Sequence, residues 1–204
     1  MKAMLALGSR ALGEGQMEVF DAIRSRRSIR AFESRPVDRE VIDRLIDAAT
    51  YAPSRMNSQP WHFHVCTGDA RKRVAEVMAM NTAYVQEYLD VLGPEVIEYA
   101  ARFYADLGSA PVVIGISAIR VDDPTAWLDD AIAVGAALEN LLLTVVEEGL
   151  AACSLTAPHW IRDRLVEAFE VADGSELMAL IVLGYGCEIP REKERHTDIV
   201  TYLT

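Results

Sequence analysis

The sequence predicts an α+β fold in three layers, in which helices outweigh the strands of a central sheet. Several long segments carry apolar residues at helical spacing, and four short β-rich apolar runs stand between them. Along the chain these segments follow the order α-α-β-α-α-β-α-β-α-β, without repeats or low-complexity linkers. Periodic structure begins only near Met17, so we interpret residues 1–16 as an N-terminal extension and residues 17–204 as one domain.

The first two predicted helices flank a cluster of arginines. An apolar helical face that begins at Val19 runs directly into the stretch RSRRSIRAF, residues 24–32. The second helix carries an apolar stripe over residues 41–49. Asp38 is its expected N-cap and Pro53 its expected stop.

A half-buried strand is predicted at residues 61–67, WHFHVCT, because apolar and polar side chains alternate there. The alternation places His62 and His64 on one face, as in a metal-binding pair. No neighbouring residue completes a ligand set, so metal binding is not favoured. Residues 69–106 have the pattern of helices, with a break expected at the Gly93-Pro94 pair.

The second half of the chain predicts three strands around one long helix. A buried strand is expected at residues 111–119, and the long helix at 127–150 is apolar nearly all round between acidic ends. At about 1.5 Å per residue this helix would span the core and a subunit interface. A short strand (151–155), a helix (158–169) and a final buried strand (176–186) follow.

Composition limits the partners and the compartment. The 20 basic and 31 acidic residues give a net charge of −11, which argues against nucleic acid or an anionic membrane as the main partner. The longest uncharged apolar run, residues 107–119, is shorter than the roughly 20 residues of a membrane span. Cys66, Cys153 and Cys187 show no CxxC spacing, which indicates a cytoplasmic protein without disulfides. Cys153 stands in an apolar run and is expected to be packed rather than nucleophilic.

Common catalytic signatures are absent from the sequence. It contains no GxxxxGK[ST] loop and no GxGxxG after a strand, so these modes of nucleotide binding are unsupported. Neither HExxH nor GxSxG occurs, so zinc peptidase and serine hydrolase chemistry lack their residues. Hydrogen-bond donors instead gather in three separated places, residues 26–30, 52–61 and 193–195.

These three places together suit a phosphate and a polar ring. Arginines this close repel one another unless an anion shares them. The amides of Asn57 and Gln59 offer a donor and an acceptor in one plane, which suits the edge of a heteroaromatic ring. Backbone N–H groups near Thr156 could meet the same ring. Each segment alone is also typical of an ordinary loop, but the combination describes a mononucleotide-like cofactor.

The residues also carry a family resemblance. Over almost all of residues 17–204 the chain resembles the FMN-dependent nitroreductase family. The matching motifs are RRSIRAF (26–32), AP-S-x-x-N-x-QPWHF (52–63), a long apolar helix ending EEGLAACSL (147–155) and a basic K-x-R in the tail (193–195).

The resemblance implies a three-layer α-β-α nitroreductase-like fold with a mostly antiparallel sheet, in an obligate homodimer. It also implies FMN as cofactor and NAD(P)H as electron donor. The implied cofactor-binding residues are Arg26, Arg27, Ser28 and Arg30 for the phosphate and ribityl chain; Pro53, Ser54, Asn57 and Gln59 from the partner subunit; Leu155 and Thr156, whose backbone lies against the ring; and Arg195, with Lys193 beside it, in the tail.

The implied activity is electron transfer from NAD(P)H to a nitroaromatic, quinone or similar small molecule, by a ping-pong mechanism. Flavin N5 would carry the chemistry, so no catalytic side chain is assigned. Some members have Pro-x-Glu-Gly where this chain has SLTA at residues 154–157, so the substrate stays open. The alternatives are a dehalogenase, a dehydrogenase or a flavin-fragmenting enzyme of the same fold, or a non-catalytic FMN-binding module.

Overall fold

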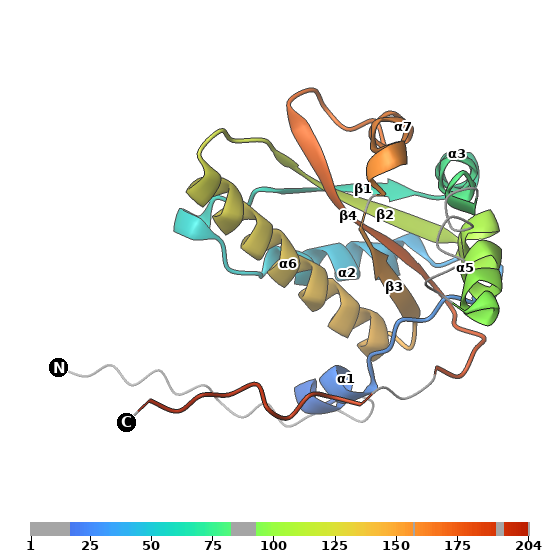
Figure 1. Ribbon diagram of the computed structural model, residues 1–204, viewed down its shortest axis with the longest axis horizontal. Helices are drawn as coiled ribbons and strands as arrows, with labels where there is room; N and C mark the ends of the chain where they lie inside the picture. The colour runs from blue at the N-terminus through green and yellow to red at the C-terminus, as the bar shows by residue number, and fades with distance from the viewer. Residues whose placement is uncertain (1–16, 83–92, 157, 191–193, 204) are drawn as a thin grey trace.

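The computed structural model describes residues 17–82, 93–156, 158–190 and 194–203. The predicted N-terminal extension therefore lies outside the described residues, as does Lys193. The described strands form one four-stranded sheet in the order β1-β2-β4-β3, and all three pairings are antiparallel (Figure 1). The strands are β1 (Trp61–Cys66), β2 (Val112–Ile119), β3 (Ala151–Leu155) and β4 (Ser175–Gly184).

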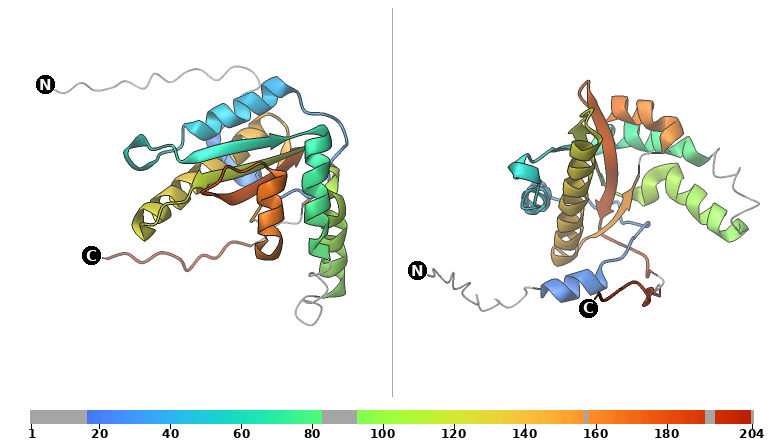
Figure 2. Two further views of the ribbon diagram at one scale, coloured as in Figure 1. Left: turned by 90° about the horizontal axis from the view of Figure 1, so that it is seen from above. Right: turned by 60° about the vertical axis from the view of Figure 1, so that its left-hand side comes forward.

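Helices cover both faces of this sheet (Figure 2). On one face, α2 (Arg39–Thr50) and α6 (Pro124–Glu147) share a core with alternate residues of β2, such as Ile114 and Ile116. On the other face, α3 (Gly68–Ala79), α5 (Pro94–Asp106) and α7 (Arg162–Ala168) pack against residues such as Val113 and Leu180. The three-layer α+β fold predicted from the sequence is thus confirmed, and so is the mostly antiparallel sheet that the resemblance implies.

In the central strand β2 all residues from Val112 to Ala118 are buried, because both faces of the strand are covered. At Gly115 an added Cβ would lie 2.9 Å from the ring of Phe169, so this ring, just after α7, packs on the sheet where a side chain is missing. A register shift between Ile116 and Ser117 follows. Ser117 is buried there, and its hydroxyl lies 2.8 Å from Nε2 of His64 on β1.

The alternation predicted for β1 is wrong at its C-terminal end. Val65 is 42% exposed, whereas Cys66 is buried and packs with α3. The helix that follows this strand covers the face that the pattern assigned to solvent. His62 and His64 do share a face, with ring centroids 4.7 Å apart.

The long helix begins and ends three residues earlier than the pattern predicts. It starts at Pro124, where the carboxylate of Asp123 accepts hydrogen bonds from the N–H groups of Thr125 and Ala126. It ends at Glu147, and Gly149 follows with φ = +68°. A cap sequence therefore sets the start of this helix, rather than its first large apolar residue.

Other predicted boundaries shift by a few residues. Asp38 occupies the N-cap of α2, but its side chain makes no cap hydrogen bond, and the helix ends before Pro53 as expected. Pro94 opens α5 at the predicted break. The helix predicted at 158–169 starts as a 3-10 turn, η4 (His159–Ile161), before α7. The last strand ends at Gly184 instead of residue 186.

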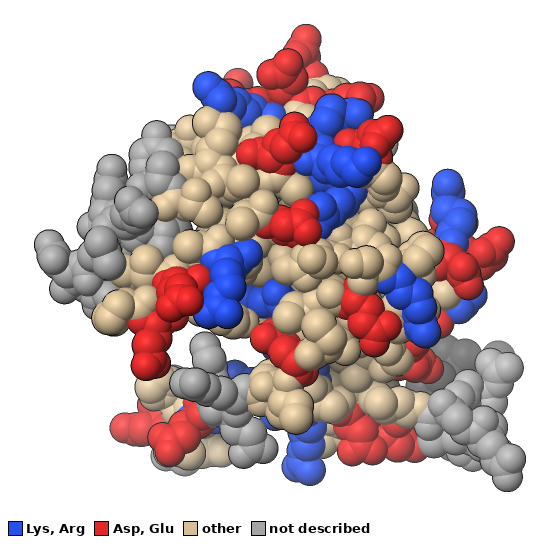
Figure 3. All heavy atoms as spheres, turned by 90° about the vertical axis from the view of Figure 1, so that its right-hand side faces the viewer, with Lys and Arg blue, Asp and Glu red and all other residues tan. Residues whose placement is uncertain are grey.

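The first helix and the C-terminal tail lie outside the three layers. Helix α1 (Val19–Ser25) packs against α6, outside the sheet. The tail after residue 194 runs as an extended segment away from the sheet (Figure 1). On the face shown in Figure 3, basic and acidic side chains are interspersed rather than gathered into a patch of one sign.

The described helices include none that is both long and apolar enough to cross a membrane.

Candidate functional site

The arginine-rich segment lies along the free edge of β3. Ser28 forms a parallel bridge with Ala152, and the N–H of Ile29 donates to the carbonyl of Ala152 at 3.0 Å. Further on, the N–H of Cys187 donates to the carbonyl of Ala31 at 3.0 Å. Residues 28–31 are therefore held between the edge of the sheet and the chain that leaves β4. This brings the predicted phosphate-binding residues beside the predicted ring-binding strand.

One glycine makes this path possible. Gly108, in the turn η3 (Leu107–Ser109), has φ = +64°, and its carbonyl accepts the N–H of Phe32 at 2.9 Å. A Cβ added to Gly108 would lie 2.0 Å from the carbonyl oxygen of Arg30. The backbone of the arginine segment thus approaches the turn so closely that no side chain fits.

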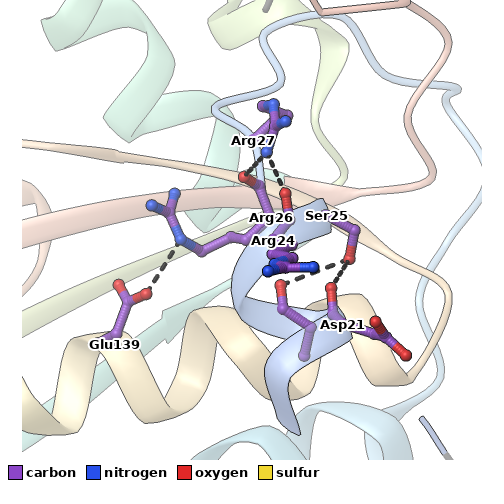
Figure 4. A network of polar contacts seen from close by, with 7 residues as sticks. Asp21, Arg24, Ser25, Arg26, Arg27 and Glu139 are labelled. Carbon is purple, nitrogen blue, oxygen red and sulfur yellow. Dashed lines mark hydrogen bonds and ion pairs between the residues drawn. The ribbon is translucent and has the colours of Figure 1, made fainter. Parts of the chain in front are cut away.

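Arg26 and Arg27 of the segment make different contacts (Figure 4). Nε of Arg26 donates to Oε1 of Glu139 on α6 at 3.0 Å. Nη1 of Arg27 donates to the carbonyls of Arg24 and Arg26, at 2.5 and 2.9 Å, and so satisfies the C-terminal end of α1. Arg27 therefore has a structural role at the end of this helix, in addition to the binding role predicted for it.

Arg30 lies in a second polar group, centred on Glu188. The Glu188 carboxylate accepts the backbone N–H of Arg30 at 2.5 Å and lies 3.3 and 3.4 Å from the hydroxyl of Tyr99 on α5. Burial, together with the nearby negative charge of Glu188, raises the pKa of Tyr99, so this phenol is protonated at neutral pH. One carboxylate thus ties three distant parts of the chain together at Arg30.

The buried thiol of Cys153 lies behind this segment. Burial raises the pKa of Cys153, and the nearby positive charge of Arg30 offsets part of this increase. A thiol with a raised pKa is a poor nucleophile. Cys153 is 1% exposed and belongs to the apolar core, as predicted.

A small cavity of about 200 Å³ lies between the arginine segment, the C-terminal half of α6 and the start of β3. Arg26, Arg27 and Ile29 line it together with apolar residues of α6. Small-molecule pockets typically measure about 300–1,000 Å³. The larger groove of about 930 Å³ lies between α2 and β1, and none of the predicted site residues lines it. Of the predicted site residues, Arg26 and Arg27 alone line the small cavity, which is below the usual size of a pocket for a whole cofactor.

The predicted loop from Pro53 to Gln59 lies at the other end of α6. Its 3-10 turn, η1 (Arg55–Asn57), contacts that helix, and Arg55 pairs with Asp129 at 3.2 Å. Asp129 and Glu139 are ten residues apart, or about 15 Å along the helix. The structure therefore separates this loop from the arginine segment within one chain.

The polar groups of this loop face outward. Pro53, Asn57 and Gln59 are exposed, and the Ser54 hydroxyl accepts the N–H of Gln59 at 3.0 Å. Met56, Asn57 and Gln59 all have positive φ, between 46° and 58°. Each such residue costs roughly 1–2 kcal/mol relative to an ordinary conformation, and strain of this kind concentrates at functional sites.

The remaining predicted residues lie apart from one another. Leu155, half-buried, ends β3, and Thr156, exposed, follows it. Arg195 is exposed in the extended tail. The structure thus places Leu155 and Thr156 on the strand that carries the arginine segment, but it does not bring Arg195 to that strand.

The histidine pair of β1 makes other contacts. Within the part of the chain that the structure describes, no group of three or more His, Cys, Asp or Glu side chains could hold a metal ion. His64 instead pairs with Ser117 and packs edge-on against Phe169.

Comparison with known proteins identifies the family. A sequence profile described as the Nitroreductase family matches residues 23–185, which include the arginine segment, the polar loop and all four strands. The chain belongs to the nitroreductase family. The resemblance inferred from its motifs is therefore confirmed.

Other nitroreductase-family proteins match most of the chain. A putative NADH dehydrogenase/NAD(P)H nitroreductase of Methanothermobacter thermautotrophicus is 31% identical over 88% of this chain and 83% of its own length. A putative NAD(P)H nitroreductase of Bacillus subtilis is 28% identical over 86% of this chain and 88% of its own length. The crystal structure of an FMN and NADPH-dependent nitroreductase from Sphigopyxis sp. strain HMH superimposes with a TM-score of 0.73, at 22% identity, over 92% of this chain and all of that one. This last likeness supports the fold.

Sequence reasoning missed three residues that shape the candidate site. Gly108 and Glu188 gave no signal, because their roles depend on chain crossings far from them in sequence. Glu139 did give one: it is the single charged residue among residues 131–146 of an otherwise apolar helix. An isolated carboxylate in such a helix needs a partner.

Proposed function

We propose that this nitroreductase-family chain is an FMN-dependent oxidoreductase that takes electrons from NAD(P)H and passes them to a nitroaromatic, quinone or similar small molecule. The observation that carries the proposal is the placement of the arginine segment along β3. It sets cationic donors beside the strand whose end, at Leu155 and Thr156, is the predicted surface for the flavin ring. The named activities of the relatives above agree with this assignment.

The donor set fits FMN. Guanidinium groups bind phosphate bidentately, and Arg26 and Arg30 lie in one short segment with the hydroxyl of Ser28 between them. The exposed amides of Asn57 and Gln59 match the polar edge of an isoalloxazine. An acidic protein with this local concentration of cations suits a small anion better than a nucleic acid.

The residues of the chain would bind and orient, rather than transfer protons. FMN, when bound, supplies the redox chemistry. The arginines and Ser28 would hold its phosphate and ribityl chain, while the backbone near Thr156 would present an N–H to the ring. Donor and acceptor would use one site in turn, which gives ping-pong kinetics. Initial-rate plots at several donor concentrations should then be parallel; intersecting plots would contradict this part of the proposal.

We further propose a cytoplasmic homodimer in which the loop at 53–59 completes the site of the partner subunit. The cavity beside Arg26 is small, and the loop lies about 15 Å away along α6, so one chain presents the two halves apart. Large apolar side chains are also exposed on α1, α6 and the tail. They include Phe20 at 62%, Ile132 at 64% and Tyr202 at 87% exposure. Exposed apolar surface of this extent is typical of an interface.

The test is purification of the full chain. It should be yellow, release one FMN per chain on denaturation, and lose its flavin absorbance when NAD(P)H is added without oxygen. The Arg30→Ala variant should bind FMN roughly 10- to 100-fold more weakly, because a charge-assisted hydrogen bond is worth about 1.5–3 kcal/mol. A colourless protein that does not take up added FMN would contradict the proposal. Bound flavin that NAD(P)H does not reduce would favour a different flavin reaction or a binding module.

A further inference from the structure

Glu139 holds Arg26 by one nitrogen only. The hydrogen bond between them runs from Nε of Arg26 to Oε1 of Glu139 at 3.0 Å. Figure 4 shows the two terminal nitrogens of Arg26 pointing away from the carboxylate. A guanidinium has five N–H donors, of which Nε carries one. The four donors on Nη1 and Nη2 therefore face away from the residue that fixes the side chain.

A second ion pair to α6 shows how different this geometry is. Arg44 on α2 donates from Nε and Nη2 to both oxygens of Glu148, at 2.6 and 2.8 Å. That pair is bidentate, so the carboxylate occupies one edge of the fork. If Glu139 served only to neutralise Arg26, the same two-bond arrangement would be the stronger one. The one-bond contact instead leaves the edge between Nη1 and Nη2 available to an anion.

The position of Glu139 supports a role beyond surface charge. It is the single charged residue among residues 131–146, on a helix that otherwise presents apolar side chains to the sheet. The Arg26 side chain is only 26% exposed and lines the small cavity beside β3. An arginine fixed at such a place loses less side-chain freedom when an anion binds.

We propose that Glu139 is a positioning residue, which orients the guanidinium of Arg26 toward the phosphate of FMN. The inference rests on the proposed function and deepens it. Glu139 acts through Arg26 on the phosphate end of the cofactor, so its contribution depends on the phosphate being present. Riboflavin, which has the same ring and ribityl chain without the phosphate, separates this role from a general structural one.

The experiment measures release of FMN and of riboflavin from the flavin-loaded full chain on dilution, by the fluorescence of the free flavin. Glu139→Ala should raise the dissociation constant of FMN about tenfold, because Arg26 must then be ordered on binding. The dissociation constant of riboflavin should change less than about twofold. Glu139→Gln keeps an oxygen that can accept the Nε hydrogen bond, and it should restore FMN binding to within about threefold of the parent chain.

Two further variants complete the design. Glu148→Ala removes the ion pair with Arg44 at the C-terminal end of α6 and should leave the FMN to riboflavin ratio unchanged. Arg26→Ala combined with Glu139→Ala should bind FMN no more weakly than Arg26→Ala alone, since the carboxylate acts through that arginine.

Opposite results would overturn the inference in distinguishable ways. Tighter FMN binding by Glu139→Ala would show that the carboxylate competes with the phosphate. Equal weakening for both flavins, or no rescue by Glu139→Gln, would show a structural role unrelated to the orientation of Arg26. If the parent chain binds neither flavin, the proposed function itself is wrong.

Discussion

The arginine segment at residues 26–30 and the polar loop at residues 53–59 both pair with α6, but their own chain supports them very differently. The segment is bonded to β3 and to Glu188, and the N–H of Phe32, just after it, donates to the carbonyl of Gly108. The loop has three hydrogen bonds, and all of them lie within its own residues: two turn bonds to the carbonyls of Ser54 and Arg55, and the bond from the N–H of Gln59 to the Ser54 hydroxyl. It also has an exposed ion pair with α6 and three residues with positive φ.

This difference indicates which part of the proposed site, the arginine segment or the polar loop, a single chain holds in place. A segment with many backbone partners keeps its shape in the isolated chain. A strained and exposed loop keeps polar groups in unfavourable geometry, and such strain persists where surrounding structure determines it. The comparison therefore agrees with the proposal that the chain itself holds the phosphate-binding half, and that its loop completes the site of a second copy.

The largest expected effect tests the support of the arginine segment. Gly108→Ala forces a Cβ to 2.0 Å from the carbonyl oxygen of Arg30 at a positive φ, so the segment must move. We expect the free energy of unfolding to fall by about 3 kcal/mol or more, with loss of flavin. Urea unfolding of the purified variant measures this.

Gly174 provides the matched control for this substitution. It also has positive φ, +79°, but an added Cβ meets nothing within 4 Å. Gly174→Ala should therefore cost only the conformational strain, about 1–2 kcal/mol, and keep the flavin. Equal losses for the two variants would show that contact with Arg30 does not matter.

A heterodimer tests whether the arginine segment and the polar loop of one site come from different chains. One chain would carry Arg30→Ala and the other the pair Asn57→Ala and Gln59→Ala, with a different tag on each chain. Each homodimer should lose most of its FMN, because every site contains one damaged half. The heterodimer purified through both tags should hold about half the flavin of the parent, since one of its two sites combines an intact segment with an intact loop.

Flavin content per chain, measured by absorbance after denaturation, checks this prediction. An empty heterodimer would show that segment and loop act within one chain, and the comparison would then fail. Parent chains carrying the same two tags, purified in the same way, are the control.

The smallest expected effect lies in the scaffold, away from both halves. Burial, together with the neighbouring His62, lowers the pKa of His64. In the window below about pH 6.5 the unfolded chain then binds a proton that the folded chain does not. The free energy of unfolding should therefore fall as the pH drops through this window, by at most about 1.4 kcal/mol per pH unit.

Unfolding of the parent chain and of His64→Gln between pH 7 and pH 5 measures this contribution. The variant should lose stability less steeply, because the titrating ring is gone. His196→Gln, at an exposed position in the tail, should follow the parent. A parent and a His64→Gln variant with the same slope would place the acid sensitivity elsewhere in the molecule.

Much of the fold was predictable because it depends on local patterns. The apolar run at β2 and the nearly all-round apolar helix α6 are each readable from a short stretch of sequence. The exposure of Val65 and the burial of Cys66 could not be predicted from the alternation, because α3 packs over that end of β1. Boundaries moved wherever a cap, such as Asp123, set them instead of periodicity.

The candidate site divides in the same way. The sequence by itself determined the family, through the motifs at residues 26–32 and 52–63, and with it the residue types that suit a phosphate and a polar ring. Only the tertiary structure decided that Glu139 holds Arg26 and that Glu188 holds the backbone of Arg30. It also decided that the backbone of Arg30 passes so close to Gly108 that no side chain fits there. The physical reason is distance along the chain. A motif is a local arrangement of side chains, whereas each of these contacts joins segments 78 to 158 residues apart, and only packing of the whole core fixes which of them meet.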